Sequence, residues 1–262
     1  MDPHQPSSRS RVRRPLVKLA STSVNLIHRR NPWVMAWWST AFPGFGQLIL
    51  GQHVKGFVLI FWEIAVNVGS QLNVAIMYSL QGQFERAKLV LDHRWFFLYT
   101  PVFIYGIWDS YRTTVSLNNS YGMAVFENAR INSFHMDSIS VNFLDRRIPW
   151  VGMIYSLLMP GLGQLYVHRL VTGFFILIWW IVIAYFSHVT EAVYFTCIGD
   201  FVRAKAVVDM EWLLFLPSIY GFACYEAYIT IVELNNLFRR EQTQYLIEHY
   251  QSSSFPLPEP NQ

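Results

Sequence analysis

Pro43-Gly44-Phe45-Gly46-Gln47-Leu48 interrupts one apolar run, and Pro160-Gly161-Leu162-Gly163-Gln164-Leu165 interrupts another 117 positions later. Proline lacks a backbone donor and ends a helix, whereas glycine allows a tight turn and a close approach by another backbone. A glutamine amide at membrane depth needs partners, because polar and non-helical groups there are tolerated only inside protein or beside a wet cavity. The prediction of the fold starts from these two stretches.

The composition is that of an integral membrane protein. Of 262 residues, 53% are hydrophobic, 17% aromatic and 14% charged, whereas ordinary soluble domains are about 25% charged. Several windows approach or exceed the ~20 apolar residues that a helix needs to cross a bilayer. The sequence therefore predicts an all-α integral membrane protein.

Positive charge is concentrated at the N-terminus. Residues 1–32 hold seven Lys and Arg against one Asp, a net charge of +6, so the remainder carries −3 of the overall +3. A basic tail beside a membrane segment indicates a cytoplasmic anchor on anionic lipid, and we expect no nucleic-acid binding. An organelle transit peptide is the lesser alternative. Residues 1–14 are predicted to be disordered, and helical spacing predicts a surface helix over Pro15–His28.

The chain repeats itself. A shift of 117 positions pairs Pro32-Trp33 with Pro149-Trp150, and Arg86-Ala87-Lys88 with Arg203-Ala204-Lys205. Roughly a third of some ninety paired positions are identical, which indicates tandem duplication. The predicted divisions are a basic cytoplasmic tail with its surface helix at 1–29, membrane repeat 1 at 30–119, a cytoplasmic connector at 120–146, membrane repeat 2 at 147–236 and a cytoplasmic C-terminal tail at 237–262.

Each repeat has apolar segments that can thread a membrane in two ways. In the first repeat they are 33–50, broken by its Pro-Gly pair, 56–80 and 95–117, with the charged stretch 81–94 between the last two. If all of them span, the repeats are inverted and the protein has six spans. If the Pro-Gly segment is a re-entrant hairpin, the repeats are parallel and each has two transmembrane helices.

The distribution of Lys and Arg favours parallel repeats. That arrangement leaves only the 81–94 loop and its counterpart outside, where positive and negative charges cancel. Cytoplasmic loops normally hold the excess of Lys and Arg. We therefore predict a multi-pass protein of the cell membrane with both termini in the cytoplasm.

The repeated motifs have a structural and a functional interpretation. The Pro-Gly stretch is either a turn whose Gln47 and Gln164 tie it to neighbouring helices, or a site where freed amides meet an ion or a lipid phosphate. The charged loops carry Arg86, Lys88, Arg203 and Lys205. These side chains are either self-paired on amphipathic helices or contacts for lipid phosphate or an anionic envelope polymer.

Acids fall within the predicted spans, among them Glu63, Asp109, Glu191 and Glu226, and of these all but Glu191 are candidates for a functional role. An acid inside a bilayer is a functional candidate because its burial is costly unless it is paired. Asp109 and Glu226 occupy one repeat position, close enough to the interface to be solvated, whereas Glu63 corresponds to Trp180. Glu63 is thus either an internally paired acid or part of a proton or cation path.

Signatures of catalysis and of bound cofactors are absent from the sequence. It has no P-loop, metal-ligand cluster, nucleophile elbow or paired carboxylates, so we predict no enzyme activity, no cofactor and no metal. Cys197 and Cys224 show no metal-binding spacing and are expected to be small buried hydrophobes.

The stretches PGFGQLILGQHVKGF and PGLGQLYVHRLVTGF resemble the PGxGQxYxGxxxKG signature of small bacterial membrane proteins related to the TM2-domain group. That group, mostly uncharacterised, implies a short helical hairpin around the turn. The first copy departs from the signature at Ile49, and the second at His168 and Thr172. The expected function is a non-enzymatic assembly or partner-binding component of the membrane. The alternative is a small transporter or channel for ions, protons or solutes at the repeat interface.

Overall fold

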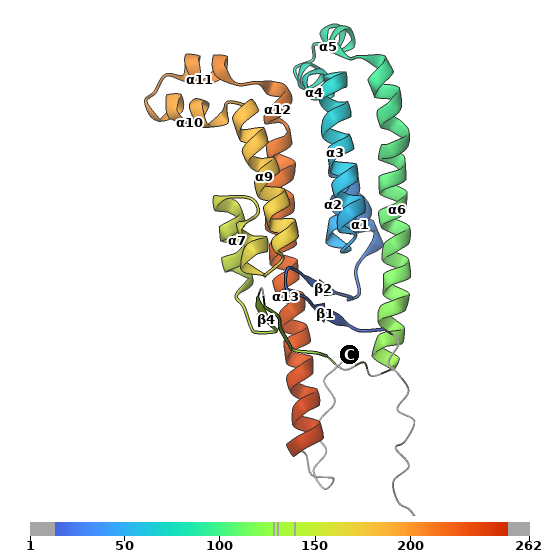
Figure 1. Cartoon of the computed structure of the whole chain (residues 1–262). Helices are drawn as coiled ribbons and strands as arrows, with labels where there is room; N and C mark the ends of the chain where they lie inside the picture. The colour runs from blue at the N-terminus through green and yellow to red at the C-terminus, as the bar shows by residue number, and fades with distance from the viewer. Residues whose placement is uncertain (1–13, 128, 130, 139, 251–262) are drawn as a thin grey trace, which may run out of the picture.

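The computed structural model describes residues 14–127, 129, 131–138 and 140–250. Of the segment 1–14 predicted to be disordered, all but Arg14 lies outside these residues, as does the part of the predicted C-terminal tail from Gln251 onward. The chain is mostly helical (Figure 1), and its N-terminal elements are β1 Val17–Leu19, β2 Val24–Leu26, α1 Pro32–Ala41, α2 Phe45–Ile49, α3 His53–Ser70, α4 Leu72–Leu80, α5 Phe84–Val90 and α6 His93–Phe126. The later elements are β3 Phe134–Met136, β4 Val141–Phe143, α7 Pro149–Leu158, α8 Leu162–Tyr166, α9 Leu170–Phe186, α10 Val189–Cys197, α11 Phe201–Val207, α12 Met210–Leu213 and α13 Phe215–Tyr250.

We call residues 32–126 the first half and residues 149–250 the second half. Helices α1 to α6 begin 117 positions before α7 to α12, respectively. The short α4–α5 and α10–α11 pairs lie at the same end of the molecule, opposite the strands (Figure 1). The charged 81–94 stretch and its counterpart thus share one end of the fold.

The predicted surface helix over Pro15–His28 is wrong, because this segment forms an antiparallel hairpin. Strand β1 pairs with β2 in the register Val17 to Leu26 and Leu19 to Val24. Val17 and Leu19 are buried while Lys18 between them is exposed, which is the two-residue period of a strand. The segment's apolar residues fit both periods, and packing against the helices favours the strand.

The connector also differs from its predicted boundaries. Helix α6 continues past residue 119 to Phe126, and a second hairpin pairs Phe134 with Phe143. The Asn142 side chain donates to the Ala20 carbonyl oxygen over 3.0 Å, so the two hairpins lie against each other. At the other boundary, α13 carries the helix through residue 237 to Tyr250.

The predicted span 56–80 is not one straight helix. It breaks at Gln71, whose φ is 54°, and α3 and α4 meet at 65°; α9 and α10 meet at 62°. By length and composition, the described residues hold one helix able to cross a membrane, Met210–Tyr250, or up to three such segments if each bent pair is one span. Residues 95–117 lie within α6, which is not one of these candidates.

Aromatic side chains join the two halves. Phe45 of α2 stacks on Phe222 of α13 with ring centroids 4.0 Å apart, and Trp38 of α1 lies 5.0 Å from Tyr225. Phe57 of α3 stacks on Phe175 of α9, also at 4.0 Å. This cluster is the main core, and it holds the Pro-Gly turns close to the long helices.

Candidate functional site

Each Pro-Gly turn requires both of its glycines, Gly44 and Gly46 in the first half and Gly161 and Gly163 in the second. Gly44 and Gly161 have φ values of 103° and 106°, a region that L side chains rarely adopt. A Cβ added to either would lie 2.6 Å from a backbone oxygen, that of Gly56 or Gly173. A Cβ on Gly46 would meet the Met35 oxygen at 2.7 Å, and Gly163 is similarly enclosed. The turns are therefore in direct backbone contact with the following helix and with the preceding one.

The two glutamines tie the turns to the long helices. The Gln47 side-chain nitrogen donates to the Gly106 oxygen over 2.9 Å and to the Asp109 carboxylate over 3.2 Å. At positions 117 higher, Gln164 donates to the Ala223 oxygen over 2.8 Å and to Glu226 over 2.9 Å. These bonds are the ones that the structural interpretation of the motif predicts.

The backbone at the start of the turn helices is also bonded internally. The amide of Phe45 donates to the Phe42 oxygen, and that of Leu162 to the Met159 oxygen, each over 3.1 Å. Pro43 and Pro160 are buried beside these bonds. These two amides are therefore not available to an ion or a phosphate.

Asp109 and Glu226 are buried, with exposed fractions of 2% and 1%, so the prediction that they are solvated is wrong. Each has a cation as compensation. The Lys55 ammonium lies 3.1 Å from both Asp109 oxygens, and the Arg169 guanidinium pairs with Glu226. Such compensation is what a buried carboxylate requires.

The cations of these two pairs come from different repeat positions. The counterpart of Lys55 is Thr172, and the counterpart of Arg169 is Gln52. The sequence shows this difference, because the second half has threonine in place of the lysine and has an arginine three positions earlier, where the first half has glutamine. The sequence alone does not identify either cation as the partner of a buried acid.

A basic cavity lies between the β1–β2 hairpin and the two halves. Its volume is about 210 Å³, and its lining includes three basic side chains, Lys18, Arg30 and Arg169. Arg169 also donates to the Leu48 oxygen of the first half over 3.3 Å, and Arg30 donates to the Ile49 oxygen over 2.5 Å. These arginines thus fasten the end of α2 as well as lining the cavity.

The basic side chains on α5 and α11 are exposed, and three of them have local partners. Lys88 lies 3.0 Å from Glu85, Arg86 donates to Gln83 over 2.9 Å, and Arg203 lies 3.1 Å from Asp200. Lys205 is on the same short helix as Arg203. The contacts of Arg86, Lys88 and Arg203 are of the kind that self-paired amphipathic helices make.

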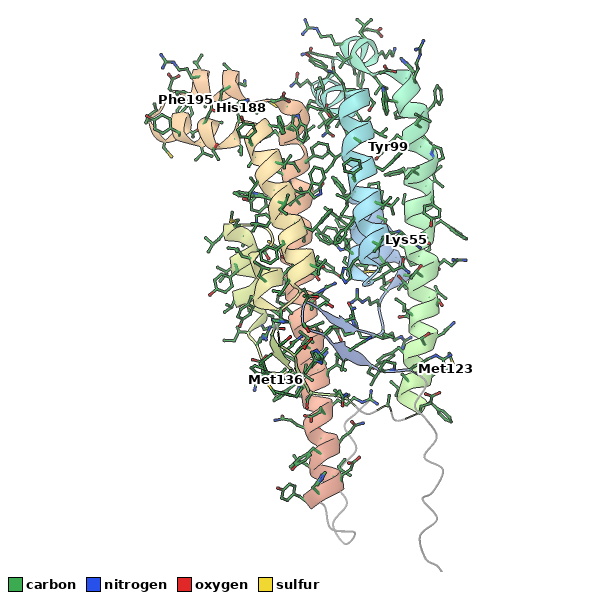
Figure 2. All side chains as sticks on the ribbon, viewed as in Figure 1. Lys55, Tyr99, Met123, Met136, His188 and Phe195 are labelled. Atoms are coloured by element: carbon green, nitrogen blue, oxygen red, sulfur yellow. The ribbon has the colours of Figure 1, made fainter. Side chains whose placement is uncertain are left out.

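Glu63 begins a chain of buried polar groups. Asn67 donates to the Glu63 carboxylate over 3.2 Å and to Asn73 over 3.3 Å, and Asn73 donates to the Glu211 backbone oxygen over 2.7 Å. Tyr99 of α6 lies beside Glu63, on the side of α3 that faces α6 (Figure 2). One carboxylate oxygen of Glu63 and one of Glu211 have no hydrogen-bond partner among the described residues.

Glu211 was not predicted as a candidate from the sequence, where it is one of the charges of the second outer loop, and the structure shows that it is buried. The cysteine prediction is wrong for Cys197, which is exposed, whereas Cys224 is partly buried. In the described part of the chain, no group of three or more His, Cys, Asp or Glu side chains could hold a metal ion.

Comparison with known proteins found no relative of this chain: no known family, no curated protein and no solved structure matches it. The residues described above therefore carry the functional argument.

Proposed function

We propose that this chain is a non-enzymatic, multi-pass component of the cell membrane that acts by assembly with protein partners. It comprises two parallel repeats, each with a Pro-Gly re-entrant hairpin and two membrane-crossing helical segments, and both termini are cytoplasmic. The basic N-terminal tail lies on anionic lipid. The resemblance of its Pro-Gly motif to that of the TM2-domain group supports this proposal.

The observation that carries this proposal is the internal use of the motif's polar groups. The amides of Gln47 and Gln164 bond to buried acids, and each acid has its own cation. Large apolar side chains are instead exposed on the outer faces, among them Trp108 and Ile178. Such surfaces mark contacts with lipid or protein. The motif therefore stabilises a scaffold, and the outer faces make the external contacts.

A repeated hydrogen bond and the position of the charged loops support the parallel arrangement. The bonds of Arg30 to Asn118 recur between Arg147 and Asn235, at the same 2.9 Å from backbone nitrogen to side-chain oxygen. Both charged loops lie at one end of the molecule (Figure 1). Inverted repeats would put those loops at opposite ends.

Reconstitution separates assembly from transport. The purified full-length protein in liposomes is expected to leave proton and cation gradients intact, while crosslinking in its native membrane captures a stable protein complex. A gradient that collapses at a rate proportional to the amount of protein would contradict the proposal.

A second function, a proton or cation path, is favoured by the buried chain from Glu63 to Glu211. Two acids joined by amides across the halves are typical of intramembrane relays. If this path conducts, Glu63→Gln abolishes the flux and the exposed control Glu85→Gln leaves it unchanged. Equal flux through both variants would exclude Glu63 as the conducting group.

A further inference from the structure

The contact between the two halves uses a different surface on each. The first half contributes α1, α2 and α4, and the second half contributes α12 and α13. Their counterparts are α7, α8 and α10 on one side of the molecule and α6 on the other (Figure 1). Each chain thus keeps one unused copy of both contact surfaces, which we call the α7–α10 face and the α6 face.

Several aromatic residues of the joined surfaces have large, exposed counterparts on the unused ones, although Leu162, the counterpart of Phe45, is only partly exposed. Trp38 is 7% exposed and Phe222 is fully buried, whereas their counterparts Tyr155 and Tyr105 are 41% and 45% exposed. The same holds for two further pairs of α13 and α6 residues, in which the α6 member is exposed: Phe215 with Leu98, and Tyr225 with Trp108.

At the contact between α3 and α9, the residues of the joint also have exposed counterparts on the unused surfaces. Phe57 stacks on Phe175 at the joint. The counterpart of Phe57 is Phe174, and that of Phe175 is Val58; both are exposed. Phe174 lies on the half that bears the α7–α10 face, and Val58 on the half that bears the α6 face. An unused surface of matching type therefore continues along each half.

The polar end of the joint has counterparts of opposite charge. At the joint, the Glu211 carboxylate accepts from the Val74 amide over 3.0 Å, where α12 meets α4. Position 94 corresponds to position 211 and holds Arg94, while position 191 corresponds to position 74 and holds Glu191. Both side chains are exposed. Glu191 pairs with His188 at 3.3 Å, a weak exposed pair that a stronger contact can replace.

We propose that the α7–α10 face of one chain docks on the α6 face of a second copy, in the way that the first half docks on the second half. Tyr155 then packs against Tyr105 of the other copy, and Glu191 pairs with Arg94. The inference rests on the proposed assembly function and names its partner. Lipid could cover the apolar side chains equally well, but it does not account for opposite charges at matching positions.

This contact is head-to-tail. Two different faces meet, so each added copy exposes one new face of each kind. Assemblies of this type grow into a ring or an open row. The basic cavity and the Glu63 chain lie within each copy and do not take part.

Thiol crosslinking between two tagged copies tests the inference. In full-length protein with Cys197→Ser and Cys224→Ser, one copy carries Glu191→Cys and the other Arg94→Cys, and both are placed together in liposomes. A disulfide dimer containing both tags is expected on mild oxidation. Samples in which both copies carry Glu191→Cys, or both carry Arg94→Cys, are the controls and should lose this product.

A second pair of cysteines tests whether the opposite charges stabilise the contact. With Tyr155→Cys on one copy and Tyr105→Cys on the other, adding Glu191→Arg to the first or Arg94→Glu to the second should lower the yield of mixed dimer. Both reversals together should restore it. If charge reversal does not change the yield of mixed dimer, or if mixed and control samples give equal yields, the inference is wrong and these faces contact lipid.

The two proposals fail separately. Ion flux in liposomes contradicts the assembly function, whatever the crosslinks show. A chain that stays monomeric in liposomes while its native membrane yields a stable complex with another protein contradicts only the head-to-tail contact.

Discussion

The buried carboxylates of Asp109 and Glu226 each need a cation, and the two halves supply it from different repeat positions. Lys55 lies in the first turn of α3, while Arg169 immediately precedes α9, three positions before Thr172. Residues three apart lie on the same side of a helix. Both positions can therefore reach the acid, which explains how the cation changed place between the halves.

Removing the buried cation should be costly. Arg169→Met leaves Glu226 without its partner and should lower the free energy of unfolding by about 3–5 kcal/mol, as for other broken buried pairs. The Lys55→Met change should cost less, since Lys55 is 38% exposed. Denaturant unfolding in detergent, followed by tryptophan fluorescence, measures both.

Moving the cation should restore stability. The double change Arg169→Gln and Thr172→Lys copies the arrangement of the first half and should recover much of what Arg169→Gln loses alone. If the double variant unfolds as readily as Arg169→Gln, then the guanidinium stabilises the fold through its bond to Leu48 instead.

Glycine at the turn can be tested against a matched glycine. Gly44→Ala forces a left-handed backbone and places a Cβ 2.6 Å from the Gly56 oxygen, so we expect a loss of about 3 kcal/mol or more. Gly82 has a φ of 75° but open space around its Cβ position. Gly82→Ala should therefore cost only ~1 kcal/mol of backbone strain. Equal losses in thermal unfolding would show that the contact does not matter.

His28 should make the fold sensitive to acid. Burial, and then the Arg30 charge, lower the pKa of His28 from 6.5 to about 3. The unfolded chain binds this proton first, so stability is full above pH 6.5 and falls as the pH drops toward 3. At pH 4.5 the loss is about 2–3 kcal/mol. Compared with the native protein, His28→Phe should show a flatter decline in stability between pH 6.5 and 4.5; parallel curves would exclude His28.

At the scale of elements, the sequence predicted the long helices and the breaks between them better than the short pieces. The Pro-Gly breaks were predictable because proline and two glycines leave few alternatives. The hairpin at residues 17–26 was not, since its spacing suits either a helix or a strand until its packing partners are known. Gln71 and His188 carry no breaker signal, yet both take positive φ and bend the helix.

Labelling tests the membrane threading of these elements. Parallel repeats predict that a cysteine at Gln83, before α5, reacts from outside, whereas a cysteine at Ser133, before β3, reacts only after the membrane is opened. Cys197 is exposed and must first be changed to serine. Reaction of both sites from the same side would favour inverted repeats.

At the scale of the whole molecule, repetition was visible in the sequence but the joint between the halves was not. Identical residues 117 positions apart predicted similar elements, and they located Gln47, Gln164 and the shared acid position. Several residues at the joint differ between the copies, although Phe57 and its counterpart Phe174 do not. Trp38 and Tyr155, or Glu211 and Arg94, have different surroundings because only one of each pair lies at the joint.

The carboxylate of Glu226 can be paired from either of two nearby positions. Losing the arginine at position 169 without a lysine at position 172 would leave the Glu226 charge buried and unpaired. A chain with basic residues at both positions keeps the carboxylate paired when either one is then removed. In a combinatorial mutant library, substitutions at 169 and 172 should therefore be strongly epistatic, with a basic residue required at one position or the other.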